Sequence, residues 1–188
     1  MDRLRELLLD PDEAMSMPVS GKTDAAVLIP LYADPQRGLV AVLTERRHDL
    51  RMHAGEISFP GGRRDPGEDL VTTALREAEE EIGLDRNGVH LMGALAPTGT
   101  MVTRYRVYPF VGVIEPGHTW APHEWEVAKV LELPLLELRR GRQWRPLLQH
   151  KLPVPTVSFV IDGHLVWGAT ARMMDQLLRR LEPVLAKE

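Results

Sequence analysis

The sequence predicts an α/β fold in which helices cover a mixed β-sheet. Apolar runs rich in β-forming residues recur between residues 25 and 166, and turn residues separate them. Amphipathic segments with helical spacing cover 69–83 and 169–185. Because strands flank these helical segments, the chain belongs to the α/β or α+β class, with the sheet between helices.

The strands follow from short apolar runs. The turn sequence ADPQRG at 33–38 joins the first two runs, so they predict a β-hairpin. Near the end of the chain, 155–168 predicts a second hairpin with Asp162-Gly163 as its two-residue turn. The other expected strands are 90–96, 105–115 and the segment that begins at 126; the first two runs are 25–32 and 39–46.

The helices follow from amphipathic spacing and from their boundary residues. Residues 2–9 predict a short helix that stops at the sequence DPDE, and 11–24 predict a loop. The central helix begins near Asp69 and ends at Gly83, a residue suited to the position after a helix. A short helix is expected to start near Pro134, and a longer one closes the chain.

Composition excludes several classes of protein. The 188 residues suit one domain, 1–188, with residues 1–24 as an N-terminal helix and loop extension. The absence of cysteine excludes disulfides, cysteine nucleophiles and cysteine-based metal sites. The net charge of −4 gives no support to nucleic-acid binding. Because no signal peptide or membrane-spanning stretch is present, we expect a cytoplasmic protein without nucleic-acid or membrane partners.

The central helix carries an unusual concentration of acidic residues. Glu77, Glu80 and Glu81 share one face that borders the apolar stripe, whereas Glu79 and Arg76 lie further round, toward solvent. Like charges at this spacing repel, and acids in the last turns oppose the helix dipole. A hard divalent cation such as Mg²⁺ or Mn²⁺ resolves the conflict; the alternative is a solvated acidic face with an ordinary ion pair.

The spacing around these acids favours the metal. A glycine is followed after five residues by an acid, after seven more by Arg-Glu, and then by Glu-Glu and Gly-Leu. This arrangement, at 62–84, resembles the Nudix box, and all of its fixed positions match. The resemblance implies an α/β/α sandwich with a mixed sheet, a loop–helix–loop that holds divalent metal, and hydrolysis of nucleoside diphosphates linked to another moiety.

The resemblance also implies a role for each acidic residue. Glu77, Glu80 and Glu81 become the principal metal ligands or bases, Glu68 an additional metal or structural contact, and Arg76 the residue that orients the glutamates. One more acidic residue near the metals is expected just before the strand that begins at 126. Glu126 is the candidate for this extra ligand or base, and Glu124 and Glu115 are its rivals.

A second signature precedes the box. Residues 42–62 resemble the signature of the coenzyme A pyrophosphatase branch of the Nudix family, and two positions depart from it. Val42 replaces leucine, and Arg47 replaces a small residue, where it adds a phosphate contact or narrows the pocket. The matching positions are Leu43, Thr44, Arg46, Arg51, Gly55, Phe59, Pro60, Gly61 and Gly62.

This second resemblance implies a substrate. We expect a Mg²⁺- or Mn²⁺-dependent pyrophosphohydrolase that cleaves coenzyme A or its derivatives to 3′,5′-ADP and 4′-phosphopantetheine or its acyl form. A Nudix hydrolase of ADP-ribose or of another nucleoside diphosphate derivative is one alternative, and a silent nucleotide-binding domain is another. The oligomeric state stays open, with a homodimer as a family-level candidate. The expected substrate contacts are Arg46, Arg51, Phe59, Gly61 and Gly62.

Overall fold

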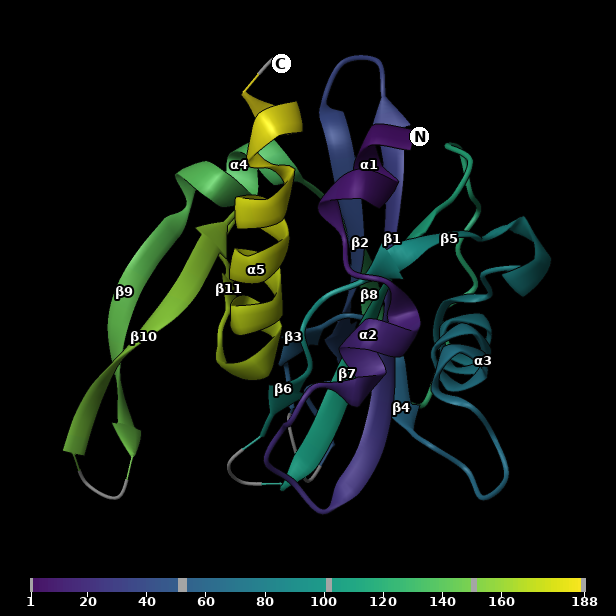
Figure 1. Ribbon diagram of the computed structural model, residues 1–188. Coiled ribbons are helices and arrows are strands. Elements are labelled where there is room, and N and C mark those ends of the chain that lie inside the picture. Colours follow the sequence, from purple (N-terminus) through teal and green to yellow (C-terminus); the bar gives the residue numbers. More distant parts are fainter. Residues whose placement is uncertain (1, 51–53, 101–102, 150–151, 187–188) are drawn as a thin grey trace.

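The central feature is a mixed β-sheet of eight strands, described in a computed structural model (Figure 1). The structure describes residues 2–50, 54–100, 103–149 and 152–186. β1 and β7 run parallel and the remaining pairs are antiparallel, so the sheet is mixed as predicted. The strands are β1 (Thr23–Asp34), β2 (Gly38–Arg46), β3 (Ile57–Ser58), β4 (Gly61–Arg63), β5 (His90–Ala94), β6 (Thr98–Gly99), β7 (Tyr105–Val113) and β8 (Val127–Pro134).

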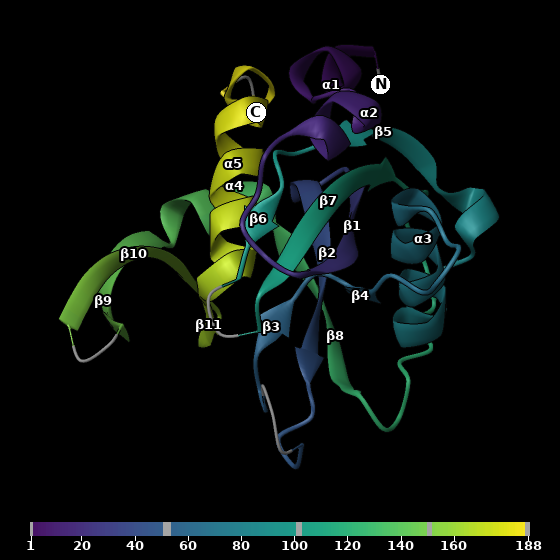
Figure 2. The same ribbon diagram turned by 60° about the horizontal axis from the view of Figure 1, so that its bottom comes forward.

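Helices cover both faces of this sheet, which confirms the predicted α/β/α sandwich (Figures 1 and 2). Alternate residues of β1 belong to different cores because side chains alternate along a strand. Val27 and Ile29 pack in the core that contains α5 (Gly168–Leu185). Ala26 and Leu28 pack in the core that contains α3 (Leu70–Ile82).

A split in the sheet positions the functional region. β1 and β2 pair only between Leu31–Asp34 and Gly38–Ala41, and toward their other ends they take different partners. There β1 pairs with β4, whereas β2 pairs with β3 and β8. Residues 57–63 therefore cross the split, and they bring β4 against α3.

The sequence explains where α3 begins and ends. The side chain of Asp69 accepts a hydrogen bond from the backbone N–H of Thr72 at 2.9 Å, which caps the first turn. Gly83 closes the helix in the left-handed conformation, with φ of 70°, which costs glycine little. Both boundaries agree with the prediction.

The N-terminal region contains one helix that the sequence analysis missed. α1 (Asp2–Leu7) matches the expected short helix, but α2 (Pro11–Ser16) lies where a loop was expected. The side chain of Asp10 accepts a hydrogen bond from the Asp12 N–H at 2.9 Å, and Pro11 occupies the first helical position. The Asp-Pro pair was interpreted as a stop signal, but it is also a strong start signal.

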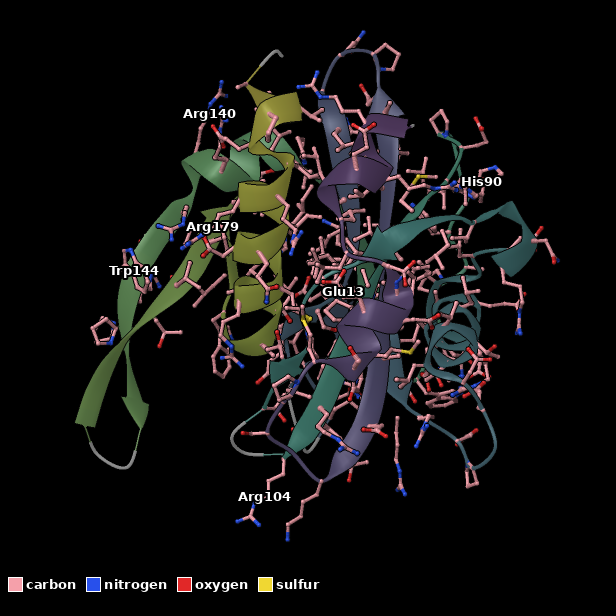
Figure 3. All side chains as sticks on the ribbon, in the orientation of Figure 1. Glu13, His90, Arg104, Arg140, Trp144 and Arg179 are labelled. Carbon is pink, nitrogen blue, oxygen red and sulfur yellow. The ribbon has the colours of Figure 1, made fainter. Side chains whose placement is uncertain are left out.

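A second, three-stranded sheet lies beyond α5. It contains β9 (Arg142–Gln149), β10 (Leu152–Ile161) and β11 (His164–Val166), in the order β11-β10-β9. The predicted turn at Asp162-Gly163 joins β10 and β11, with φ of 48° and 80°. β9 was not predicted; it follows α4 (Leu135–Arg140) and, with β10, projects away from the main sheet, carrying Trp144 (Figures 1 and 3). Within the described ranges, no helix is long and apolar enough to cross a membrane.

Candidate active site

The acidic face of α3 lies against β4. The carboxylate of Glu81 is buried, and its Oε2 atom has no hydrogen-bond partner among the described residues. The Glu77 side chain is 17% exposed, whereas that of Glu80 is 57% exposed and reaches solvent. A Cβ atom on Gly62 would lie 2.5 Å from the Glu77 carboxylate, so the glycine makes this close approach possible.

Arg76 joins these carboxylates to the preceding loop. Its Nη1 lies 2.9 Å from Glu77 Oε1 and 3.1 Å from Glu80 Oε2, and its Nε lies 3.0 Å from Glu68 Oε1. The side chain is only 19% exposed, so the expectation that Arg76 faces solvent was wrong. The reason is tertiary, because the loop after Arg63 folds back and covers this side of the helix with Glu68.

Burial and mutual repulsion perturb two of the glutamates. Burial, with the neighbouring Glu77, raises the pKa of Glu81 to about 8, although Arg46 and the Gly61 N–H favour its charged form. Burial also raises the pKa of Glu77, and Arg76 opposes this effect. By contrast, hydrogen bonds from Arg76 lower the pKa of Glu68. The buried carboxyl of Glu81 and the partly buried carboxyl of Glu77 therefore favour a further positive charge beside them.

The donor set fits a hard divalent cation in chemical type. The available ligands are carboxylate oxygens, which Mg²⁺ and Mn²⁺ prefer, and the buried Oε2 of Glu81 has no hydrogen-bond partner in the part of the chain that the structure describes. Across the residues that the structure describes, no group of three acidic, histidine or cysteine side chains is arranged to hold a metal ion. Arg76 holds Glu77 and Glu80 in ion pairs. Glu77, Glu80 and Glu81 are the residues that would hold the ion.

The expected substrate contacts occupy different environments. Arg46 lies near Glu81, and its Nε is buried without a hydrogen-bond partner among the described residues. Gly61 lies beside the buried Glu81, and Gly62 lies beside the partly buried Glu77. Phe59 is 1% exposed and its side chain packs in the core on the α5 side, so a substrate contact at this position stays a prediction. Arg51 lies outside the described residues.

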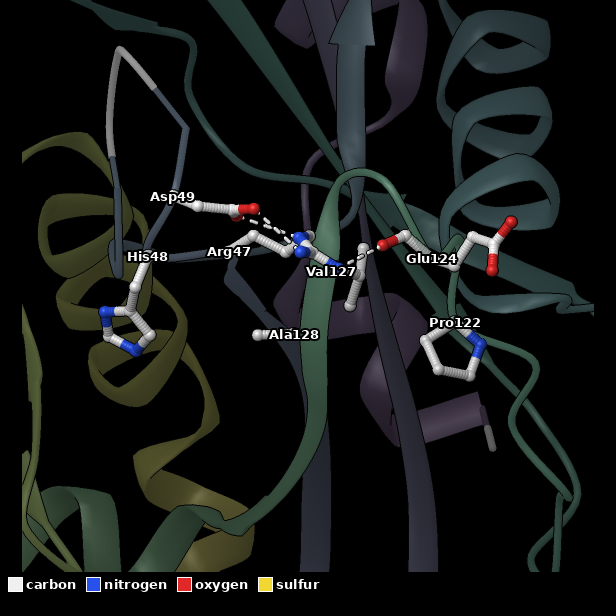
Figure 4. A pocket seen from close by; sticks show the side chains of 7 residues that line it. All are labelled: Arg47, His48, Asp49, Pro122, Glu124, Val127 and Ala128. Atoms are coloured by element: carbon white, nitrogen blue, oxygen red, sulfur yellow. Dashed lines mark hydrogen bonds and ion pairs between the residues drawn. The ribbon is translucent and has the colours of Figure 1, made fainter.

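Arg47 has partners within the protein. Its Nε and Nη2 bind the Asp49 carboxylate at 2.8 and 2.7 Å, and Nη1 donates to the Glu124 carbonyl at 2.8 Å (Figure 4). These contacts join the loop after β2 to the loop before β8, beside an open pocket of about 590 Å³. The pocket lining is Arg47, His48, Asp49, Pro122, Glu124, Val127 and Ala128, none of which belongs to α3.

The candidates for the additional acidic residue lie at different distances from the acidic face of α3. Glu126 raises the pKa of both Glu77 and Glu81, so its charge acts on the site, and its carbonyl accepts the Arg47 N–H at 3.0 Å. Glu115 lies near the opposite end of the sheet. It follows Ile114, whose N–H pairs with Leu31, about 17 Å along β1 from the residue opposite Gly62.

Another charged cluster was missed by the sequence analysis. Asp24, at the start of β1, pairs with Arg64 Nη2 at 3.0 Å and with Arg106 Nη2 at 2.7 Å. Residue 24 lies two positions before the residue that pairs with Gly62, so the cluster borders the site. No local signal could have predicted this cluster, because its three members lie on separate strands and loops.

Comparisons with known proteins agree with this arrangement. Residues 22–151 match the family model described as NUDIX domain. A protein from Yersinia enterocolitica, described as "Uncharacterized Nudix hydrolase NudL", is 38% identical over 160 residues, which cover 84% of this chain and 80% of that protein. Its namesake from Photorhabdus laumondii is 37% identical over 171 residues, covering 84% of each chain.

Solved structures share the fold at low identity. The binary complex of a C. elegans Ap4A hydrolase superposes with a TM-score of 0.59 at 16% identity, covering 89% of this chain and all of that one (100%). The NUDIX domain of Shewanella oneidensis NrtR, complexed with ADP ribose, gives a TM-score of 0.54 at 15% identity, covering 85% and 88%. The matched domain model, the two relatives and the shared sandwich lead to one conclusion: the chain belongs to the Nudix family of hydrolases.

Proposed function

We propose that the protein hydrolyses the diphosphate of coenzyme A or of a coenzyme A derivative, with Mg²⁺ or Mn²⁺ as cofactor. The products are 3′,5′-ADP and 4′-phosphopantetheine, or its acyl form. Family membership supports diphosphate hydrolysis, and the signature at 42–62 supports the choice of coenzyme A.

One observation carries the proposal: the substrate signature and the acidic helix meet at the same carboxylates. Gly61, at the end of the signature, and Arg46 both favour the charged form of Glu81 and so oppose the rise of its pKa. Gly62 lies directly beside the Glu77 carboxylate. A ligand held by the signature would therefore lie next to the candidate metal ligands.

Different residues of the candidate site have different chemical roles. Glu77, Glu80 and Glu81 would hold the cation, and Arg76 fixes two of these carboxylates while Glu68 fixes Arg76. When bound, the cation neutralises the diphosphate and lowers the pKa of a water molecule. Glu126 is the candidate to accept a proton, because its charge reaches the site and its side chain is exposed to water.

Positive charge beside the glutamates suits a phosphate-rich ligand. Arg46 supplies a guanidinium near Glu81, and its Nε is buried without a hydrogen-bond partner among the described residues. Arg64 and Arg106 lie nearby, but they share the charge of Asp24. Arg46 is therefore the arginine that we assign to the diphosphate.

Two alternatives remain distinct proposals. The C. elegans neighbour is an Ap4A hydrolase, and the Shewanella domain was solved with ADP ribose; at 15–16% identity these likenesses support the fold alone. A hydrolase of such nucleoside diphosphate derivatives would share the glutamates but not need the 42–62 signature. A domain that only binds nucleotide would not need Glu77, Glu80 and Glu81.

A substrate panel separates these functions. The protein is incubated with coenzyme A, ADP-ribose, diadenosine tetraphosphate and an oxidised nucleoside triphosphate, each with Mg²⁺ or Mn²⁺, and products are identified by mass. Cleavage of coenzyme A at the highest kcat/KM supports the proposal. Cleavage of ADP-ribose without cleavage of coenzyme A contradicts it, and binding without cleavage of any substrate favours the silent domain.

A further inference from the structure

We propose that Asp24, Arg64 and Arg106, the Asp24 cluster, form a binding site for a phosphate monoester and so select nucleotides that carry a 3′-phosphate. The inference rests on the proposed function, because coenzyme A has a 3′-phosphate in addition to its diphosphate. It assigns both phosphate groups to the α3 side of the sheet: the diphosphate to the glutamates, and the monoester to the Asp24 cluster.

The Asp24 cluster has an excess of positive charge. Asp24 Oδ2 lies 3.0 Å from Arg64 Nη2, and Asp24 Oδ1 lies 2.7 Å from Arg106 Nη2. One carboxylate therefore faces two guanidinium groups, which leaves one positive charge uncompensated within the cluster. Asp65, the acid that follows Arg64 in the chain, lies 4.0 Å from Nη2 of Arg76. An anionic ligand would neutralise the excess charge.

The two arginines have donors available for such a ligand. A guanidinium carries five N–H donors and a carboxylate accepts about four hydrogen bonds, so one aspartate cannot satisfy two arginines. The Nε of Arg106 has no hydrogen-bond partner among the described residues. The side chains of Arg64 and Arg106 are 43% and 36% exposed, so a ligand from solvent can reach both. Planar guanidinium groups bind phosphate through paired N–H donors.

The backbone holds the cluster in place. The Arg64 N–H donates to the Asp24 carbonyl at 3.0 Å, and Asp24 pairs with Arg106 in the parallel ladder of β1 and β7. A Cβ atom on Gly21 would lie 2.6 Å from Cγ of Arg106, so the chain before β1 packs against the stem of this arginine. Because the cluster is formed without a ligand, binding has a lower entropy cost.

Strand alternation puts the cluster on the same face of the sheet as the glutamates. Ala26 of β1 and Tyr108 of β7 pack in the core that contains α3. Asp24 lies two residues before Ala26, so its side chain points to the same face. Arg106 lies two residues before Tyr108 and therefore points to that face as well.

The separation of the cluster from the glutamates suits one nucleotide. Gly62, which lies beside the Glu77 carboxylate, pairs with Ala26 of β1. Arg64 lies two residues beyond Gly62, or about 7 Å at the spacing of an extended strand. The 3′- and 5′-phosphates of one ribose are only a few bonds apart, so their two sites must be close neighbours. The cluster and the glutamates meet this requirement.

A second aspartate shared by two arginines provides a matched control. Asp175 of α5 lies 2.7 Å from Arg142 Nε and 2.8 Å from Arg179 Nη2. This group joins α5 to β9, and α5 covers the opposite face of the sheet from α3 (Figure 3). Arg179→Gln therefore removes an arginine from the same arrangement of charges, far from the proposed site.

A second control tests whether any positive charge at this end of the sheet would serve. Arg104 adjoins β7, and its carbonyl accepts the Lys22 N–H at 2.7 Å, just before β1. Its side chain is exposed and points away from the molecule into solvent (Figure 3). Arg104→Gln therefore removes a nearby charge that the proposed site does not use.

The test compares coenzyme A with 3′-dephospho-coenzyme A. kcat/KM is measured for both substrates, with Mg²⁺ or Mn²⁺, for the wild type, Arg64→Gln, Arg106→Gln, Arg179→Gln and Arg104→Gln. The wild type is expected to prefer coenzyme A. Arg64→Gln and Arg106→Gln are each expected to lower that preference about tenfold to a hundredfold, through KM, because a charged hydrogen bond is lost. The two control variants should keep the wild-type preference.

Several results would overturn the proposal. They are a wild type without preference for coenzyme A, an unchanged preference in both Arg64→Gln and Arg106→Gln, or an equal loss in either control variant. If neither Arg64→Gln nor Arg106→Gln folds, Arg64→Lys decides: a preference below wild type supports the proposal, and an unchanged one overturns it.

A binding measurement separates this inference from the proposed function. If the wild type cleaves neither substrate, the proposed function fails, and calorimetry then compares 3′,5′-ADP with 5′-AMP. Tighter binding of 3′,5′-ADP that is weakened in Arg64→Gln or Arg106→Gln supports the Asp24 cluster as a phosphate site. Equal binding of the two nucleotides, no binding of either, or a difference that both variants retain overturns it.

Discussion

Gly62 and Glu77 are in such close approach that a Cβ atom on the glycine would lie 2.5 Å from the carboxylate. Gly62→Ala is therefore expected to displace the end of Glu77, which is a flexible group, and to disturb the candidate metal site. We predict a loss of activity of about a hundredfold with little loss of stability, because misplacement of a reacting group by about 1 Å has this effect. Steady-state kinetics and thermal unfolding measure the two quantities.

The neighbouring glycine provides the contrast. A Cβ on Gly61 would lie 2.4 Å from the backbone oxygen of Ala26, which cannot move freely. Gly61→Ala should therefore lower the unfolding temperature as well as the activity. If Gly62→Ala is as destabilised as Gly61→Ala, then the close approach to Glu77 is not the cause of its inactivity.

Glu68 is expected to act through Arg76. Glu68→Gln weakens the contact of 3.0 Å with Arg76 Nε, and a charged hydrogen bond at a partly buried site is worth about 1.5–3 kcal/mol. We predict a loss of stability in this range and a fall in kcat, because Arg76 then holds Glu77 and Glu80 less firmly.

Glu79→Gln is the matched control on the same helix. Glu79 pairs with Arg86, and both side chains are more than a third exposed, at 40% and 39%. Exposed ion pairs contribute about 0–1 kcal/mol, so this variant should stay near wild type. Equal losses in the two variants would contradict the distinction between them.

The stability of the metal-free protein should depend on pH through Glu81. Its pKa is raised from 4.5 to about 8 in the folded state, so the folded protein binds more protons than the unfolded chain between these values. The stability that neutral Glu81 contributes is complete below pH 4.5 and is lost as the pH rises to about 8. Urea unfolding in a chelator should therefore show stability falling across this window.

Glu81→Gln should reduce the slope of unfolding free energy against pH. Part of the slope should remain, because burial also raises the pKa of Glu77. Saturating Mg²⁺ or Mn²⁺ should remove the slope in the wild type, since the cation favours the charged carboxylates. An identical pH dependence in the wild type and Glu81→Gln would contradict the burial that we describe.

Arg47 is expected to have no direct role in phosphate binding. Its guanidinium binds Asp49 and the Glu124 carbonyl, and the Arg47 side chain is 39% exposed. Arg47→Ser restores a small residue at this position of the signature. We predict little change in stability and a KM for coenzyme A within about twofold of wild type. A tenfold rise in KM would instead favour the phosphate contact.

The sequence predicted local features better than contacts between distant segments. The boundaries of α3 follow from Asp69 and Gly83, whose signals lie within a few residues of the helix ends. α2 was missed because Asp10-Pro11 carries the signals of both a stop and a start. β9 pairs with β10. It was not predicted because the hydrophobic pattern of β10 was assigned to the hairpin at 155–168, which leaves β9 without a partner.

The candidate site shows the same limit. Helical spacing placed Glu77, Glu80 and Glu81 on one face, but it gave Arg76 the wrong direction, because the loop that carries Glu68 folds over the helix. The Asp24 cluster depends on strand register, which a pattern of single residues does not contain.

The most direct test of the central claim is the release of 3′,5′-ADP from coenzyme A, measured by mass with the wild type and Glu81→Gln. We predict release by the wild type that requires Mg²⁺ or Mn²⁺ and is reduced by orders of magnitude in a folded Glu81→Gln variant. Metal-independent release, or equal release by the two proteins, would contradict the assignment of the acidic face of α3 as the active site. Absence of release by the wild type would contradict coenzyme A as the substrate.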